Sequence, residues 1–89
     1  MKKSIKKILT NRLYRDIVKF FHANPASIDS PRGISTWIKA ERSDVKKALG
    51  ELAKAGVLIE HKGTSTAGYS YTRDTGILRE IGKLLKKER

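Results

Sequence analysis

The chain has 89 residues and no cysteine, so it has room for one hydrophobic core and excludes disulfides and thiolate metal sites. Its 20 lysines and arginines outnumber 9 aspartates and glutamates, which gives a formal net charge of +11. This excess favours nucleic acid as a partner, then an anionic membrane surface, then an acidic protein. A solubilising role for the charge is the alternative. We predict a single domain over residues 1–89.

The N-terminal segment has no long apolar run, because it is interrupted by Lys2, Lys3, Lys6 and Lys7. Apolar runs elsewhere in the chain are also short. A secretory signal or a membrane span needs a longer uninterrupted run. We therefore expect a soluble, cytoplasmic protein with no membrane partner.

Apolar residues recur every three or four positions in the first quarter of the chain, at Leu9, Leu13, Ile17, Phe20 and Phe21. This spacing predicts an amphipathic helix. Either Thr10 or Asn11 caps it, or the pattern continues back through Ile5 and Ile8 as one longer helix. Asn24-Pro25 ends the helix, because a residue before proline is driven out of the helical region.

Ser30-Pro31 predicts the start of a second helix, with serine as the N-cap and proline at the first helical position. The apolar side of this helix consists of Ile34, Trp37 and Ile38, and we expect Trp37 to lie in the core rather than to stack on a ligand. After a turn around Lys39 to Glu41, a third helix buries Val45, Ala48, Leu49 and Leu52. Gly56 is the expected left-handed residue just past its end.

Two strand-like runs follow, over residues 57–62 and 69–73, and the loop Gly63–Gly68 joins them into a predicted hairpin. An extended piece at Ser27-Ile28 is a candidate partner for it. From Thr75 onward a last helix carries an apolar stripe of Ile77, Leu78, Ile81, Leu84 and Leu85. Three helices and a hairpin already supply the core, so we expect residues 75–89 to use part of this stripe to bind a second copy.

The order of helix, helix, helix, hairpin and helix resembles the winged helix-turn-helix transcriptional regulators, especially the small MarR-like and ArsR-like groups. The resemblance rests on the separation of Ile34 from Val45, on Leu49-x-x-Leu52-x-x-x-Gly56-Val57-Leu58, and on Tyr71-x-x-x-x-Gly76. It implies a mainly α chain with a small β-hairpin, in the α+β class. Lys39 stands where the family often has glycine. A left-handed lysine is strained, so a differently shaped turn is an alternative there.

The resemblance also implies binding to double-stranded DNA by a homodimer, with residues 42–55 in the major groove and residues 62–69 as a wing on the backbone or minor groove. The exposed side of that helix carries Arg42, Ser43, Asp44, Lys46 and Lys47. We expect Arg42 and one of the two lysines to donate to guanine, and Ser43 to contact a phosphate or cap the helix. Asp44 lies near the N-terminus of the helix, where the positive end of the helix dipole favours a negative charge. The wing candidates for phosphate contact are Lys62, Thr64, Ser65, Thr66 and Arg73.

Groups that would support other chemistry are sparse. His22 and His61 lack the paired spacing of metal ligands, and Tyr69 stands where a P-loop needs lysine after Gly63–Gly68. We predict no enzyme activity, cofactor or metal. Tyr69 and Tyr71 share a strand face that could stack on a partner, but we expect at least one of them to pack against the helices. Two alternatives to a DNA-binding regulator stay open: a structured-RNA binder, and a protein-interaction module, which Asp44 and Glu51 on the third helix mildly favour.

Overall fold

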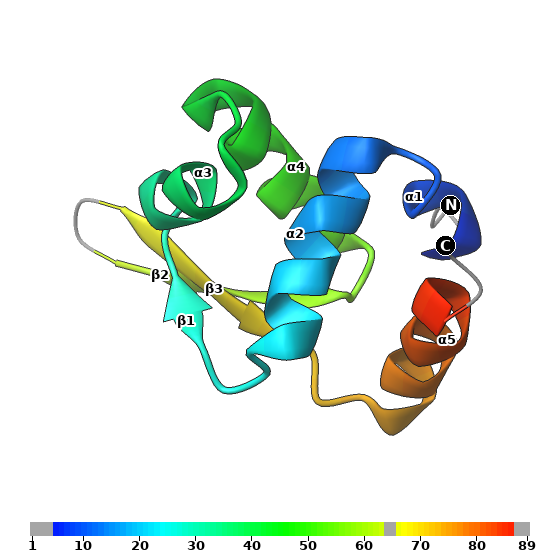
Figure 1. Ribbon diagram of the computed structural model, residues 1–89. Helices are drawn as coiled ribbons and strands as arrows, with labels where there is room; N and C mark the ends of the chain where they lie inside the picture. Colours follow the sequence, from blue (N-terminus) through cyan, green and yellow to red (C-terminus); the bar gives the residue numbers. More distant parts are fainter. Residues whose placement is uncertain (1–4, 64–65, 87–89) are drawn as a thin grey trace.

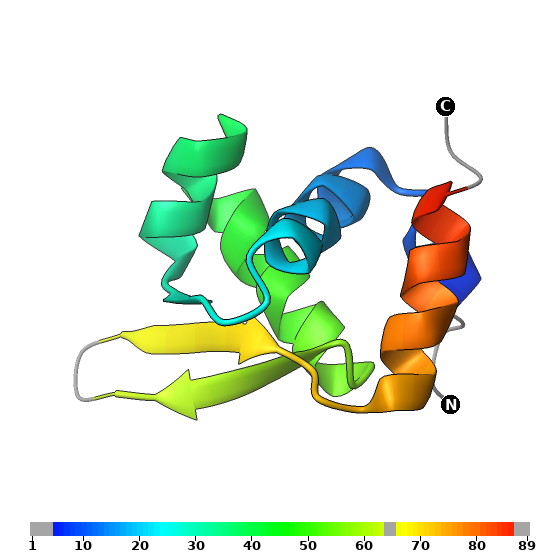
Figure 2. The ribbon, with the colours of Figure 1, turned by 60° about the horizontal axis from the view of Figure 1, so that its bottom comes forward.

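The computed structural model describes residues 5–63 and 66–86, which form helices packed on one face of a three-stranded sheet (Figures 1 and 2). In chain order the elements are α1 (Ile5–Ile8), α2 (Arg12–Ala23), β1 (Ile28–Asp29), α3 (Pro31–Ile38), α4 (Arg42–Lys54), β2 (Leu58–Lys62), β3 (Ala67–Tyr71) and α5 (Thr75–Lys86). The mainly helical α+β class predicted from the sequence is confirmed. Across the described residues, no helix is both long and apolar enough to cross a membrane.

The N-terminal apolar pattern forms two helices rather than one. Asn11 has an extended backbone, and its side chain accepts hydrogen bonds from the N–H groups of Leu13 (2.9 Å) and Tyr14 (3.3 Å). This cap starts α2 and separates it from the single turn of α1. The Asn24 N–H bonds to the carbonyls of Phe20 and Phe21 and closes the other end, as the following proline predicted.

The connection between α3 and α4 keeps a tight turn with lysine in the strained position. Ser30 caps α3 by accepting from the Gly33 N–H at 3.2 Å, with Pro31 at the first turn. Lys39 ends α3 with φ of 57° and ψ of 52°, the left-handed region that glycine tolerates best. Gly56 has φ of 86° after α4 and is the predicted left-handed residue. The turn of different shape is therefore not adopted.

The hairpin forms, but its strands differ from the predicted ranges. β2 and β3 pair antiparallel from Leu58 opposite Tyr71 to Lys62 opposite Ala67, and the Gly63 N–H donates to the Thr66 carbonyl at 3.1 Å. Residues 67 and 68 therefore belong to the strand, and the loop is shorter than predicted. At the other end the Thr72 hydroxyl accepts from the Asp74 N–H at 3.1 Å, and this local turn ends β3 before residue 73.

A third strand is present as β1, at Ile28–Asp29, one residue later than the extended piece predicted at Ser27-Ile28. It pairs with β3 through Ile28 opposite Ser70 and Asp29 opposite Tyr69, which gives the sheet order β1-β3-β2. Gly68 makes room for it, because an added Cβ would lie 3.2 Å from the Ile28 side chain.

The core lies between the helices and the covered face of the sheet. Its largest fully buried side chains come from four helices and the start of the hairpin: Ile17, Val18, Phe21, Ile34, Val45, Leu49, Leu52, Val57 and Ile81. The α4 stripe predicted from the sequence is buried as expected. Tyr69 and Tyr71 are 5% and 3% exposed, so both pack in the core, and burial raises the pKa of Tyr71 to about 12.

Candidate nucleic-acid interface

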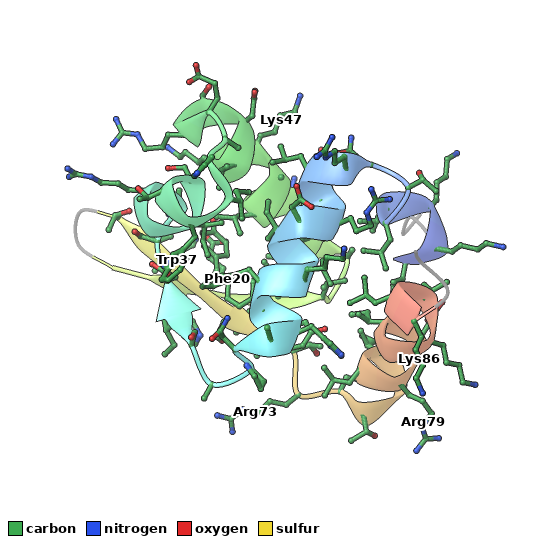
Figure 3. The ribbon with its side chains drawn as sticks, in the orientation of Figure 1. Phe20, Trp37, Lys47, Arg73, Arg79 and Lys86 are labelled. Carbon is green, nitrogen blue, oxygen red and sulfur yellow. The ribbon has the colours of Figure 1, made fainter. Side chains whose placement is uncertain are left out.

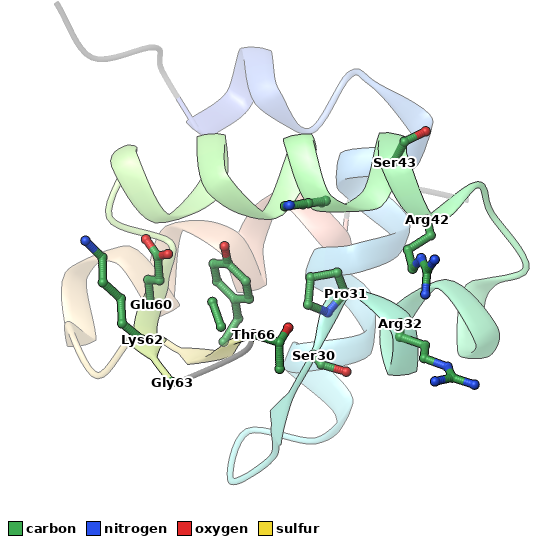
Figure 4. A pocket seen from close by; sticks show the side chains of 12 residues that line it. Ser30, Pro31, Arg32, Arg42, Ser43, Glu60, Lys62, Gly63 and Thr66 are labelled. Atoms are coloured by element: carbon green, nitrogen blue, oxygen red, sulfur yellow. The ribbon is translucent and has the colours of Figure 1, made fainter.

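An open cleft of about 850 Å³ separates the first half of α4 from the hairpin (Figure 4). Three segments that are distant in sequence line it. The start of α3 contributes Ser30, Pro31 and Arg32, the start of α4 contributes Arg42, Ser43 and Lys46, and the hairpin contributes Glu60, Lys62, Gly63, Thr66, Ala67 and Tyr69. The two helix starts come together because the Lys39 turn folds α4 back across α3.

The charges around this cleft are strongly unequal. Arg32, Arg42, Lys46 and Lys62 are all exposed, and Glu60 is the one carboxylate among the described lining residues. Figure 4 shows Arg32 and Arg42 together at one end, with Lys62 and Glu60 at the other. Burial, followed by the Glu60 charge, raises the pKa of Tyr69, so its hydroxyl stays protonated and hydrogen-bonds Glu60. The cleft therefore has two cations, Arg32 and Arg42, at one end, and Lys62 beside the Glu60 carboxylate at the other.

The α4 surface beside the cleft is open to a partner. Glu41 occupies the N-cap position but its side chain makes no capping hydrogen bond, so N–H groups of the first turn stay available to an anion. Ser43 lies inside this first turn, so its predicted capping role is wrong. Gly50 continues the same face, and a Cβ added there would meet nothing within 4 Å. Packing does not require glycine at this position.

The structure brings together some of the predicted DNA contacts and separates others. Arg42, Ser43, Lys46, Lys62 and Thr66 line the cleft. Asp44 and Lys47 are exposed on α4 but do not line it, and Figure 3 shows Lys47 pointing away from the sheet. Thr64 and Ser65 lie outside the described residues.

Arg73 is placed apart from the other wing candidates. It follows β3 on the connection to α5, at the end of the strand away from the turn that contains Gly63 and Thr66 (Figure 3). In the antiparallel hairpin Lys62 pairs with Ala67 beside the turn, whereas Arg73 follows the other end of β3. The two cations therefore lie at opposite ends of the hairpin.

Sequence reasoning missed Arg32 and Glu60 as lining residues. Ser30-Pro31 marked the start of α3, which places Arg32 in an exposed first turn, but the pattern carries no information on the strand opposite. Glu60 follows from strand alternation only once its pairing with Tyr69 is known.

Trp37 is not in the core, contrary to the sequence-based prediction. It is 69% exposed, and its ring lies 5.9 Å from that of Phe20 at an interplanar angle of 40°. Trp37 lies near the end of the two-turn helix α3, where its ring packs on Phe20 of α2.

Glu51 has an internal role. Its carboxylate accepts a 2.7 Å hydrogen bond from the Tyr14 hydroxyl, which ties α4 to α2. Burial and this bond raise the pKa of Tyr14 to about 12. Because its carboxylate binds Tyr14 within the domain, Glu51 does not favour a protein-binding surface on α4.

The sequence matches no protein-family model and no curated protein. Among solved structures, the chain is similar to a possible transcriptional regulator from Methanosarcina mazei Go1, with 18% identity, a TM-score of 0.73, and coverage of 92% of this chain and 73% of that one. It is also similar to reduced HlyU from Vibrio cholerae N16961, with 18% identity, a TM-score of 0.69, and 92% and 82% coverage. A second HlyU structure gives 17% identity, a TM-score of 0.67, and 92% and 85% coverage. Together with the element order, these likenesses show that the chain has the winged helix-turn-helix fold.

Proposed function

We propose that this chain binds double-stranded DNA as a small transcriptional regulator. In this proposal the first half of α4 enters the major groove, and the β2–β3 turn lies on the adjacent backbone or minor groove. Arg42 and Lys46 contact base edges and phosphates, while Arg32 and Lys62 hold phosphates on either side.

The observation that carries the proposal is the set of four exposed cations around the cleft between α4 and the hairpin. A duplex offers two phosphate strands on either side of a groove, so cations at both ends of a cleft match its charge pattern. The uncapped start of α4 adds N–H donors at the same place. The fold, shared with a possible transcriptional regulator, supports the same function.

The proposal predicts that binding to random duplex DNA weakens steeply with salt. Each phosphate neutralised by a cation releases counterions, so a complex with about 6–10 phosphate contacts loses about three to five decades of affinity between about 50 and 200 mM salt. Electrophoretic mobility shift at these two salt concentrations measures the effect. A flat salt response, or no shift at the lower concentration, contradicts DNA binding.

Base reading and backbone contact are separable by mutation. Arg42→Ala is expected to cost about 1–3 kcal/mol on the best site and to relax base preference there. Lys62→Ala should instead weaken all sequences alike and lower the salt slope by about one. Selection from a random duplex library, followed by titration of the selected site, measures both effects.

Arg73→Ala is the matched control, since it removes one exposed cation from outside the cleft. The Arg73→Ala variant should bind duplex DNA with an affinity close to that of the unmodified chain. If Arg42→Ala leaves affinity and preference unchanged while Arg73→Ala weakens binding, α4 is not the reading helix.

Duplex RNA of the same sequence distinguishes the RNA alternative. A-form RNA has a deep, narrow major groove that α4 side chains cannot enter, so it should compete weakly for the site. Competition by RNA at equal concentration would overturn the DNA assignment in favour of RNA.

We also propose that the regulator is a homodimer, with the apolar edge of α5 as the contact surface. The stripe is not fully covered by its own domain: Ile77, Leu78, Leu84 and Leu85 are only partly buried, although they pack against the core. A two-fold pair presents two α4 helices to successive turns of the same groove.

A further inference from the structure

A second cationic surface lies on α5. Arg79, Lys83 and Lys86 are exposed and follow one another at spacings of four and three residues, so they form a row along one face of the helix. This row is opposite the apolar stripe. At 1.5 Å per residue it spans about 10 Å, which matches about three phosphates of one DNA strand at 3.4 Å of axial rise each.

The row borders a second cleft, of about 530 Å³, between the end of α2 and α5. The lining residues are His22, Arg79, Gly82, Lys83, Leu85 and Lys86, and none of these described residues is a carboxylate. The Tyr71 hydroxyl lies 3.1 Å from Nδ1 of His22 and fixes the orientation of the imidazole. Gly82 leaves the floor open, since an added Cβ would lie 3.9 Å from the His22 ring.

This surface and the first cleft are at opposite ends of the molecule. In both ribbon views α5 lies at the end away from the β2–β3 turn, with α2 and α4 between them (Figures 1 and 2). Figure 3 shows Arg79 and Lys86 on that far side. A straight duplex seated on α4 and the hairpin therefore leaves the α5 row free.

We propose that the α5 row binds the phosphate backbone of a second duplex segment, so that one chain bridges two pieces of DNA. This inference rests on the proposed function for its first contact and adds a second, sequence-independent one. A membrane is the less suitable partner, because an interfacial helix must insert its apolar face, whereas Ile81 at the centre of that face on α5 is fully buried in the domain.

Bridging is measured by capture of one duplex on another. A biotinylated duplex on beads, incubated with the full chain and a fluorescent duplex without biotin, retains fluorescence only if protein links the two. The test variant carries Arg79→Gln, Lys83→Gln and Lys86→Gln. The charge-matched control carries Lys6→Gln, Arg12→Gln and Lys54→Gln, three exposed positions on α1, α2 and α4 that line neither cleft.

The α5 variant should lose captured DNA by about tenfold or more, because about three phosphate contacts disappear, while its shift of a single dilute duplex changes little. The control variant should bridge nearly as well as the unmodified chain. Sedimentation of all three proteins verifies that their oligomeric state is equal, which we expect for the α5 variant because its substitutions lie opposite the apolar stripe.

Three outcomes overturn the inference. One is equal capture by the α5 variant and the unmodified chain, and another is no capture at any protein concentration by a chain that still shifts single duplexes. The third is binding to phosphatidylserine vesicles that the α5 substitutions abolish, without DNA bridging, which would assign the row to a membrane. A chain that shifts no duplex at all would instead remove the proposed function.

Discussion

Trp37 and Ile34 lie three residues apart on α3, yet Ile34 is fully buried and Trp37 is 69% exposed. Both belong to the apolar side of the helix, so periodicity alone ranks them together. Their burial differs because Ile34 belongs to the core cluster between α3 and its neighbours α2 and α4, whereas the Trp37 ring lies outside that cluster and packs on the ring of Phe20. The stability of the domain should follow burial and not side-chain size.

Ile34→Ala is expected to lower the free energy of unfolding by about 2–5 kcal/mol, since it removes a fully buried side chain and leaves a cavity. Trp37→Ala should cost only about 0.5–1.5 kcal/mol, the contribution of an aromatic pair such as that with Phe20. Urea denaturation followed by far-UV circular dichroism measures both. A larger loss of stability for Trp37→Ala than for Ile34→Ala would indicate that Trp37 packs in the core.

The α3–α4 turn and the end of α4 use the same left-handed conformation with different residues. Lys39 has φ of 57° and carries a Cβ, whereas Gly56 has φ of 86° and carries none. A non-glycine residue in the left-handed region costs about 1–2 kcal/mol of folding free energy. Glycine avoids this strain, but it loses more backbone entropy on folding, so its net advantage is smaller. The α3–α4 turn would therefore be more stable with glycine in place of Lys39.

Lys39→Gly is expected to stabilise the domain by about 0.5–1 kcal/mol, and Gly56→Ala to destabilise it by about 1 kcal/mol. The new methyl group at residue 56 would lie 3.6 Å from Ile77, an ordinary contact, so the cost is in the backbone. Lys39→Ala is the control that removes the charge and keeps the strain. Thermal denaturation of the three variants should rank Lys39→Gly first, and any other order contradicts the role given to this turn.

Local sequence patterns predicted the helices and strands well. They predicted the end of β3 and the contacts between elements less well. The helix caps at Ser30, the end at Gly56 and the buried stripe of α4 depend on residues close in sequence, so they were readable. The end of β3 was not, because the Thr72 side chain competes with the ladder for the Asp74 N–H. The cleft was predicted only in part for a different reason, since Arg32 and Glu60 come to line it only through tertiary packing.

On α5 the charged row and the apolar stripe lie on opposite faces of the helix, which bears on assembly. The first cleft and the α5 row present cations at the two ends of a molecule whose longest dimension is 36 Å. The partly covered apolar stripe of α5 faces α1 and the core, opposite that row. Dimer contact through the stripe and DNA contact through the row are therefore compatible on one helix.

Sedimentation of the unmodified chain at micromolar concentration tests the dimer directly. The chain has a mass of 10.0 kDa, and a homodimer sediments at twice that mass. A dimer with two-fold symmetry would set its α4 helices about one DNA turn apart, roughly 34 Å. Leu84→Asp should yield a folded monomer, because Leu84 is only partly buried and a charge is strongly disfavoured in an apolar contact.

Ile81→Asp is the contrasting variant, since Ile81 is fully buried and a carboxylate there should unfold the domain rather than dissociate it. Circular dichroism separates the two results. If the unmodified chain sediments as a single 10.0 kDa species, there is no stable homodimer and the α5 stripe only covers its own core. Two α4 helices would then reach one DNA site only by independent binding, and the steepness of the binding curve would fall to that of a single domain.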